Sequence, residues 1–399
     1  MPTICLVSCV KTKVAGTVAA KDLYNSALFT KNAQYASAIA DKWFVLSAKH
    51  GLLDPEDVIA SYDETLSKAS VDVRREWAHK VYQQLRSLVM PGDSVIFLAG
   101  EKYREYLVPL LEKIPVVVQV PMEGLSIGNQ LKWLNQRLEE IRRHHDVDKF
   151  YELLARLQNG LSGKKQVSEL NGKSLPAKGL YLFFEDGEVR KQKSELRVTR
   201  VGTHGVSKGS KSTLWHRIKT HRGKLDLGGN HRGSIFRLHV GNALINKLFD
   251  RKQYSNWGVG QSAGRDITAN EQDLESEVSR YICRMKLLWL FVGDESGRNS
   301  DRAFLEKNII GLLSYPAGTI DPPSADWLGN YSSKEVIRKS GLWNLDYVGY
   351  RYDSRFFDVL EEYIEVTLGN KPAPKTSIAP TDGKQNEGRA KSQQLKLWE

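Results

Sequence analysis

The stretch Lys178-Gly179-Leu180-Tyr181-Leu182-Phe183-Phe184 is apolar, rich in aromatic residues and of strand length. A charged segment separates it from a second apolar run, residues 196–201, which ends at Gly202. Two such runs joined by a polar turn are typical of antiparallel strands. Residues 212–221 follow with helical spacing, so the sequence predicts a strand pair with a helix beside it.

Three side chains in this region have the chemistry of a functional site. Arg217 and His221 lie one turn apart on the predicted helix and therefore share a face. Residues 301–313 form a later helical pattern in which Glu306 interrupts a run of apolar side chains. A carboxylate at that place either points to solvent or serves a site.

The positive charge of the chain is concentrated around these residues. The whole chain has 399 residues and a formal net charge of +11. The segment from Arg190 to Arg237 has thirteen basic and two acidic residues, so it carries +11 alone. Its mixture of Arg, His and Gly with Trp215 favours a surface that meets phosphates, and a solvated basic loop is the alternative.

The first 135 residues alternate strand-length apolar runs with helical patterns, which is typical of a mostly parallel α/β sheet. The expected strands are 4–7, 43–47, 94–99 and 116–120, and the expected helices are 32–41, 72–89, 102–113 and 129–145. We therefore predict an α/β fold class, in which a mostly parallel α/β sheet domain precedes a compact α+β domain with insertions. The predicted divisions are a first domain at 1–145, a polar linker at 146–178, a second domain at 179–368 and a disordered tail at 369–399.

Composition excludes several classes of protein. No run reaches the ~18–20 apolar residues that a membrane span requires, and the start of the chain lacks the pattern of a secretion signal. Its three cysteines are too few for a disulfide framework and are not spaced as in a tetrahedral zinc site. We expect a cytoplasmic protein with free thiols and no membrane partner.

From Gly179 to about Phe357 the sequence resembles the GIY-YIG nuclease family. The first signature is matched by Gly179-Leu180-Tyr181, and the second by Arg200-Val201-Gly202, which keeps the glycine and replaces the tyrosine. The other site residues of the family fall on Arg217, His221, His231, Glu306 and Asn344. The resemblance implies a compact nuclease domain and a metal-dependent DNA endonuclease.

The residues fit this chemistry. Hydrolysis of a phosphodiester requires a nucleophilic water, a divalent metal and a cation that stabilises the transition state. Tyr181 suits a general base or relay, Arg217 a fork that holds the phosphate, and Glu306 a ligand for Mg²⁺ or Mn²⁺. His221 can share the proton transfer, and the resemblance adds His231. The missing second tyrosine leaves the proton path open, because Arg200 cannot act as a base at neutral pH.

A further set of side chains is expected to bind nucleic acid; DNA is favoured over RNA, although both present phosphates and the sequence does not decide between them. Seven members are basic residues of the basic segment, and the resemblance adds an asparagine from much later in the chain: Arg200, Lys208, Lys211, Lys219, Arg222, Lys224, Arg232 and Asn344. Basic side chains of this kind neutralise phosphates and give binding that depends on salt.

Polar side chains also follow the predicted strands of the N-terminal domain, and ligands of open α/β sheets bind at the carboxyl ends of strands. These candidates for base recognition are Ser8, Lys11, Lys13, Ser47, His50, Tyr62 and Asp63. Generic loop chemistry is the alternative.

Residues 46–66 resemble the peroxide-stress family YaaA, and the opening loop resembles related domains and, more distantly, uracil-DNA-glycosylase-like folds. The resemblance implies a pocket for a nucleobase or nucleotide. Lys11 and Lys13 would meet phosphate, and His50 or Tyr62 would contact the base. For excision, Asp63 would activate water, or Lys11 would form a Schiff base with the opened sugar.

Our leading hypothesis is a metal-dependent DNA endonuclease whose first domain recognises, or excises, a base that can carry a modification. Such a pairing suits antiviral defence by restriction of foreign or phage DNA. One alternative is an inactive nuclease fold that binds nucleic acid or senses a ligand. Another is a DNA glycosylase or base-modifying enzyme whose C-terminal domain holds the substrate. A homodimer would serve double-strand cleavage.

Overall fold

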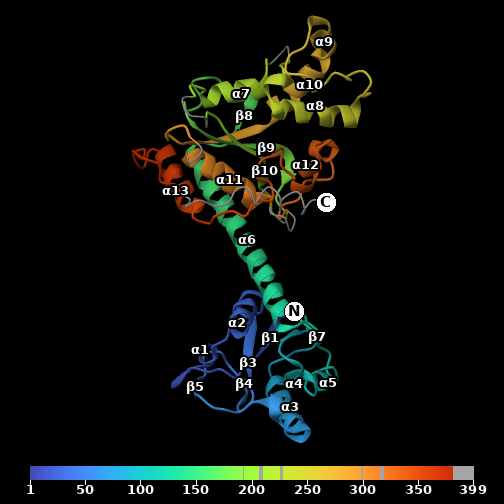
Figure 1. Cartoon of the computed structure of the whole chain (residues 1–399), viewed down its shortest axis with the longest axis vertical. Helices are drawn as coiled ribbons and strands as arrows, with labels where there is room; N and C mark the ends of the chain where they lie inside the picture. Colours follow the sequence, from blue (N-terminus) through green and yellow to red (C-terminus); the bar gives the residue numbers. More distant parts are fainter. Residues whose placement is uncertain (192, 206–209, 225–227, 298–299, 315–318, 381–399) are drawn as a thin grey trace. The chain divides into compact units, whose positions relative to one another are not determined.

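The computed structural model describes residues 1–191, 193–205, 210–224, 228–297, 300–314 and 319–380 (Figure 1). The chain divides into two compact units, Met1–Arg143 and His144–Glu399, and helix α6 (Ile127–Gly160) crosses the boundary between them. Across the described ranges, no helix is long and apolar enough to cross a membrane.

The N-terminal unit is built on a five-stranded sheet of order β4-β3-β1-β6-β7. β1 is parallel to β3 and β6, and β6 is parallel to β7, whereas β4 is antiparallel to β3. The elements are β1 (Thr3–Ser8), β2 (Thr17–Ala19), α1 (Ala20–Leu23), α2 (Ala27–Ile39), β3 (Lys42–Ser47), β4 (Gly51–Leu53), β5 (Val58–Ala60), η1 (Leu66–Lys68), α3 (Val71–Leu85), β6 (Ser94–Leu98), α4 (Glu101–Arg104), α5 (Val108–Leu111) and β7 (Val117–Gln119). Both faces of β1 are buried, as expected of a central parallel strand. The mostly parallel α/β sheet expected from the sequence is confirmed.

Several helices of this unit differ from the prediction, among them α3, which ends at Leu85 rather than at Val89. α2 begins at Ala27, five residues before the predicted start, because the Ser26 hydroxyl caps it by accepting from the Phe29 N–H (3.1 Å). The helix predicted over 102–113 is two short helices, α4 and α5. Pro109, at the start of α5, has no N–H to donate to the preceding turn, so one continuous helix cannot form.

The C-terminal unit is built on an antiparallel sheet of order β10-β9-β11-β8. After α6 its elements are β8 (Lys165–Gln166), η2 (Val167–Glu169), β9 (Gly179–Val189), β10 (Leu196–Thr203), α7 (Leu214–Arg222), η3 (His231–Gly233), α8 (Ile235–Leu248), α9 (Arg265–Asn270), α10 (Gln272–Arg284), β11 (Lys286–Phe291), α11 (Asp301–Leu313), η4 (Leu328–Tyr331), α12 (Glu335–Ser340) and α13 (Phe356–Thr367). The compact α+β arrangement with insertions agrees with the expectation.

Alternation along β9 decides which helices cover which face of this sheet. Leu180, Leu182 and Phe184 pack with residues of α6, α11 and α13. Tyr181 and Phe183 point the opposite way and pack with α7, α8 and α10. Figure 1 shows these two groups of helices on opposite sides of β9. Tyr181 therefore faces α7, which carries Arg217 and His221.

The segment 146–178, expected as a polar linker, belongs instead to the C-terminal unit. α6 continues through it to Gly160, and β8 pairs with β11. Val147, Phe150, Leu154 and Leu157 follow one helical face and lie in the core. The exposed polar residues between them masked this apolar face in the sequence.

The segment expected as a disordered tail is also partly ordered. Asp301, which is fully buried, accepts backbone N–H bonds from Ile378 (3.0 Å) and Ala379 (2.8 Å). The Ser377 hydroxyl donates to the same carboxylate. These contacts tie residues 377–379 to the start of α11, and residues 381–399 lie outside the described part of the chain.

Candidate functional site

The pairing of β9 with β10 brings the two signature segments together. In the antiparallel register Tyr181 lies opposite Gly202. A Cβ atom on Gly202 would lie 2.2 Å from the Tyr181 hydroxyl oxygen, a distance that no packed structure tolerates. The phenol therefore occupies the space that the glycine leaves free, which explains why the second signature needs glycine at this position.

The Tyr181 hydroxyl begins a buried chain of three polar side chains. Its oxygen lies 2.9 Å from Nε2 of His221, in the last turn of α7. Nδ1 of the same imidazole lies 2.8 Å from Oγ of Ser234, the N-cap residue of α8. The three residues are at most 1% exposed. Burial, and then the charges of the nearby arginines, hold the pKa of His221 well below its usual range, so the imidazole is neutral at physiological pH.

Two guanidinium groups lie close enough to this chain to influence it. Both Arg200 and Arg217 lower the pKa of His221 and oppose the rise in the pKa of Glu306. Arg200 is 9% exposed, donates to the Trp343 carbonyl (2.9 Å) and lies over the Phe236 ring. In the described structure, the Nε atoms of Arg200 and Arg217 are buried without a hydrogen-bond partner. Each of the two cations therefore keeps one N–H without a protein partner next to the buried chain.

Glu306 lies on α11, whose first turn is capped by the Ser300 hydroxyl. Burial raises the pKa of this half-buried carboxyl from 4.5 to about 7, although the charge of Arg200 and a hydrogen bond from the Thr203 N–H act in the opposite direction. A bound cation would relieve this unfavourable ionisation. Among the described residues, no group of three or more His, Cys, Asp or Glu side chains could hold a metal. A single carboxylate such as Glu306 suits an ion such as Mg²⁺, which binds one or two carboxylates and keeps water and phosphate oxygens as its other ligands.

Asn344 lies beside this site, but its side chain serves the backbone. The amide oxygen accepts from the Val201 N–H (3.0 Å), and the amide nitrogen donates to the Val201 carbonyl (2.8 Å). Asn344 is 6% exposed. It holds β10 in place next to Gly202, and this geometry does not support the expected contact with nucleic acid.

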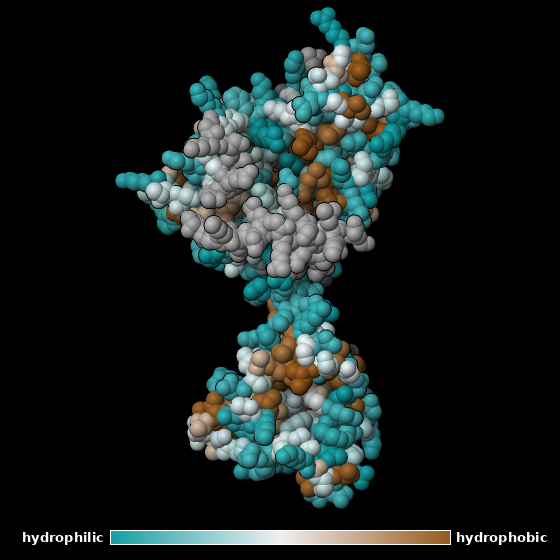
Figure 2. Space-filling model, viewed as in Figure 1, coloured by the Kyte–Doolittle hydropathy of each residue, from teal (hydrophilic) through white to brown (hydrophobic). Residues whose placement is uncertain are grey.

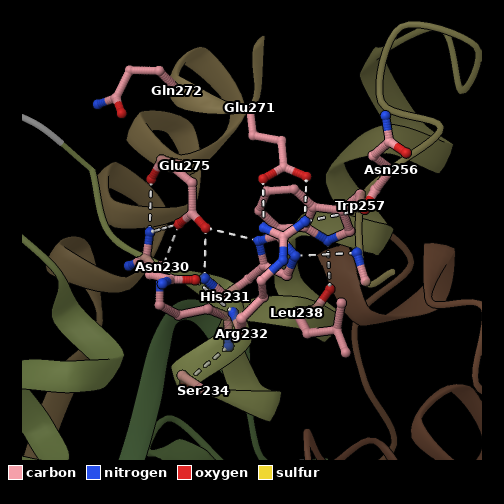
Figure 3. A network of polar contacts seen from close by, with 12 residues as sticks. Asn230, His231, Arg232, Ser234, Leu238, Asn256, Trp257, Glu271, Gln272 and Glu275 are labelled. Atoms are coloured by element: carbon pink, nitrogen blue, oxygen red, sulfur yellow. Dashed lines mark hydrogen bonds and ion pairs between the residues drawn. The ribbon is translucent and has the colours of Figure 1, made fainter. Parts of the chain in front are cut away.

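His231 does not join the Tyr181 chain. Figure 3 shows it stacked on Trp257, with the ring centroids 3.7 Å apart. Its Nδ1 lies 2.9 Å from a Glu275 carboxylate oxygen, and its Nε2 accepts from the Gly258 N–H (3.1 Å). Both ring nitrogens are engaged, so His231 anchors the loop that contains Trp257 rather than serving the catalytic role expected from the sequence.

The basic segment is less available to nucleic acid than its net charge suggested. Four of its arginines form ion pairs with carboxylates of the same unit and have side chains at most 4% exposed: Arg190, Arg197, Arg232 and Arg237. The expected nucleic-acid contact of Arg232 is therefore not supported, because its guanidinium forms a forked pair with Glu271 (2.6 and 2.9 Å; Figure 3). The carboxylates lie outside the basic segment, except for Glu195, so their pairing was not visible in the sequence.

Three of the remaining basic candidates are accessible to solvent. Lys211, Lys219 and Lys224 are exposed, and the face of each unit seen in Figure 2 is largely hydrophilic. Arg222 is half-buried, donates to the Leu170 carbonyl (2.7 Å) and lies over the Trp215 ring. Lys208 lies outside the described residues.

Two residues that support the site, Ser234 and Arg237, lie outside the signature motifs and were not predicted from the sequence. Ser234 precedes a helical pattern, and a serine in that place is a recognisable N-cap signal. Arg237 is fully buried, and one of its nitrogens donates to the His221 carbonyl (3.0 Å) and to the Arg222 carbonyl (3.1 Å) at the end of α7. An arginine inside a basic segment gives no sequence signal for such a buried structural role.

In the N-terminal unit, three of the residues expected to recognise a base lie around a fourth, Tyr62. The Tyr62 hydroxyl lies 2.7 Å from Ser47 Oγ and 2.8 Å from the hydroxyl of Tyr24, which was not predicted. The Lys13 ammonium lies 4.3 Å from the centre of the Tyr62 ring, and the His50 ring meets that ring edge-on. These five residues form what we call the Tyr62 cluster.

The Tyr62 cluster lies beyond the carboxyl ends of β1 and β3, next to the central strand where the sheet order reverses. Ligands bind open α/β sheets at such points. Ser8 is half-buried at the end of β1, and Lys11 and Asp63 are exposed. The Lys13 ammonium donates to the Lys11 carbonyl (3.5 Å), whereas within the described structure the hydrogen bonds of the cluster do not include Ser8 or Asp63.

Comparison with known proteins divides the chain in a similar way. Residues 141–369, more than half of the chain, match the GIY-YIG domain. Residues 4–136 match a family of unknown function, DUF6884. The uncharacterized protein YfjM of Bacillus subtilis (strain 168) is 31% identical over 153 residues, which cover 35% of this chain and 97% of that protein. No solved structure matches the chain.

These matches bear on the expectations from the sequence. The GIY-YIG match confirms the resemblance stated for the C-terminal unit and supports a nuclease-type function with DNA as the bound polymer. The N-terminal match carries no function, so the resemblance to YaaA and glycosylase-like folds stays a prediction. The chain therefore belongs to the GIY-YIG domain family.

Proposed function

We propose that the C-terminal unit is a divalent-metal-dependent DNA endonuclease and that the N-terminal unit recognises a base or nucleotide in the substrate. The observation that supports the first part most strongly is the convergence of one phenol, two guanidinium groups and one half-buried carboxylate at the β9–β10 pair. Each of these groups matches a need of phosphodiester hydrolysis.

The residues divide the reaction between them. Arg217 and Arg200 hold the scissile phosphate and stabilise the extra negative charge that develops on its oxygens. Tyr181, as the phenolate, takes one proton from the attacking water. The resulting hydroxide forms a bond to phosphorus, and the bond to the leaving oxygen breaks, after which that oxygen takes a proton from solvent.

Glu306 would hold the divalent metal. A metal at that carboxylate supplies polarisation of the phosphoryl oxygen and stabilisation of the leaving oxygen. Because burial raises the pKa of Glu306 to about 7, a cation is needed to keep the carboxylate ionised in the neutral range. Mg²⁺ or Mn²⁺ has the preference for oxygen ligands that a single carboxylate and a phosphate satisfy.

The Tyr62 cluster supports the proposed role of the N-terminal unit. The ring of Tyr62 and the Lys13 ammonium offer stacking and charge, and Ser47 and Tyr24 fix the Tyr62 hydroxyl. Burial, and then the charges of Lys49 and Lys80, lower the pKa of His50, so positive charge lies near this cluster. Both features suit a nucleotide. Excision of the base is not part of the proposal, because Asp63 is exposed and forms no hydrogen bond or ion pair with the cluster among the described residues.

A nuclease joined to a base-recognition unit would suit restriction of foreign or phage DNA. One active site cuts one strand, so double-strand cleavage would require a homodimer or two successive nicks. Duplex DNA is the proposed substrate, and RNA is the comparison that tests it.

The test is a cleavage assay with the full chain. Plain duplex DNA, duplex DNA with modified bases, and RNA are incubated with the protein and Mg²⁺, Mn²⁺ or EDTA. Arg217→Met and Glu306→Gln should reduce the single-turnover rate by at least about 100-fold. Arg280→Met on α10 and Glu152→Gln on α6 remove the same charges from exposed positions and should cut like wild type.

Intact DNA under every condition, or full activity of both site variants, would overturn the nuclease proposal. DNA binding without cleavage would favour the alternative in which the arginine at position 200 has replaced a required tyrosine and left a binding protein.

A further inference from the structure

Ser234 connects the start of α8 to the base of the proposed active site. Its hydroxyl oxygen caps α8 by accepting the Arg237 N–H (3.3 Å) and lies 2.8 Å from Nδ1 of His221. The side chain is 1% exposed. A buried hydroxyl needs a partner for its own proton as well as for its oxygen.

The chain from Ser234 through His221 to Tyr181 contains two hydrogen bonds but three protons. These protons belong to the serine hydroxyl, the neutral imidazole and the phenol. One proton at one end of the chain is therefore left over, and the two possible directions of the chain place it at opposite ends.

If His221 carried its proton on Nδ1, it would donate to Ser234, and the serine proton would be left over. That proton would then lie beside the N-terminus of α8, where the neighbouring groups are other N–H donors. Among the described residues, Ser234 Oγ makes no further hydrogen bond that could take it. This direction leaves a buried donor unsatisfied.

If Ser234 donates to Nδ1, its oxygen still accepts from Arg237 and its proton is satisfied. His221 then carries its proton on Nε2 and donates to the Tyr181 oxygen, which lies 2.9 Å away. The left-over proton is then the phenol proton, and Tyr181 is also fully buried, with no further partner for its hydroxyl among the described residues. A general base gives this proton up, and the phenolate leaves the chain with two protons for its two hydrogen bonds, whereas the serine proton of the other direction would stay unsatisfied.

We propose that Ser234 is a positioning residue that fixes His221 in the Nε2–H tautomer, so that the imidazole donates a hydrogen bond to Tyr181 and stabilises its phenolate. This inference rests on the proposed role of Tyr181 as the base. The second signature tyrosine is replaced by Arg200, and in its absence the hydrogen-bond partner of Tyr181 is His221 of α7, held by Ser234 at the start of α8.

The charges around His221 agree with a donor role. Arg200 on β10, Arg217 on α7 and Arg237 on α8 all disfavour a positive imidazole, as does burial. His221 therefore does not store a proton taken from Tyr181.

The tautomer is read directly from the nitrogen-15 chemical shifts of the imidazole in the full chain, labelled at histidine and assigned with His221→Asn. We expect the signal of Nε2 to be that of a protonated nitrogen and the signal of Nδ1 that of an unprotonated one. Nδ1 protonated in wild type would overturn the proposal. This measurement needs no DNA, so it can fail while cleavage succeeds, or succeed while cleavage fails.

Substitution tests the role of the hydroxyl. Ser234→Ala should remove the fixed tautomer signal and lower kcat by about tenfold, the value of one hydrogen bond, without changing KM. Ser234→Thr keeps a hydroxyl and should restore both. Ser26→Ala removes a comparable N-cap from α2 and should change neither. An unchanged tautomer signal in Ser234→Ala would contradict the proposal.

Discussion

Glu306→Gln should stabilise the metal-free protein at alkaline pH, because the wild-type carboxyl ionises there at a cost. Burial raises the pKa of Glu306 from 4.5 to about 7. Between these two values the folded state keeps a proton that the unfolded state has lost, so stability falls as the pH rises. This rise in the pKa from 4.5 to about 7 corresponds to about 3.4 kcal/mol at most, and partial solvent access reduces this to about 2 kcal/mol.

The glutamine variant cannot ionise and therefore avoids this loss. In EDTA at pH 8, urea unfolding followed by tryptophan fluorescence should show the C-terminal unit of Glu306→Gln more stable than wild type by about 2 kcal/mol. At pH 4.5 the difference should largely disappear. Glu152→Gln, which removes an exposed carboxylate from α6, should show no such pH dependence.

Addition of Mg²⁺ at pH 8 should stabilise wild type and leave Glu306→Gln unchanged, because the ion binds the folded state through this carboxylate. Two results would refute this account of Glu306 as a buried carboxylate that ionises at a cost and binds a metal. One is a Glu306→Gln variant that is less stable than wild type at pH 8. The other is a gain in stability that is the same at pH 4.5 and at pH 8.

Three further outcomes are expected. Arg237→Met should destabilise the C-terminal unit in urea by about 3–5 kcal/mol, because it leaves the buried Glu275 without its ion-pair partner; a loss below 1 kcal/mol would contradict the buried network. Gly202→Ala should lower the cleavage rate at least about 100-fold, since its Cβ displaces the Tyr181 hydroxyl and small misplacements at a reacting group are costly; wild-type rates would contradict the contact. Three lysines are exposed and are replaced together with glutamine: Lys211, Lys219 and Lys224. The replacement should weaken binding to all DNA sequences alike and reduce the slope of log K against log salt by up to about 2.7. A changed base preference with an unchanged slope would contradict the assignment of these lysines to phosphate.

Local patterns in the sequence were sufficient for the elements that carry the site. The aromatic run around Tyr181 predicted β9, and the pattern around Glu306 predicted α11 with the bounds that the structure has, Asp301–Leu313. Both rely on short-range periodicity, which a single sequence contains. The pairing of Tyr181 with Gly202 follows from adjacent strands and needs no distant partner.

Long-range partners explain where sequence reasoning failed. His231 and Arg237 are held by Glu275, which is 44 and 38 residues further along the chain. Nothing near either residue in the sequence indicates that a carboxylate on α10 neutralises this part of the basic segment. The net charge was counted correctly, but burial and pairing decide how much of it a phosphate can reach.

Tyr181, Arg217 and Glu306 are proposed to direct water onto a phosphodiester, and isotope transfer tests that claim most directly. Duplex DNA is cut by the full chain with Mg²⁺ in water enriched in oxygen-18, and all products are weighed by mass spectrometry. We predict fragments that carry one oxygen-18 atom on a terminal phosphate, with no free base released. Released base with an oxygen-18 atom on the sugar, or DNA that stays intact, would contradict the account.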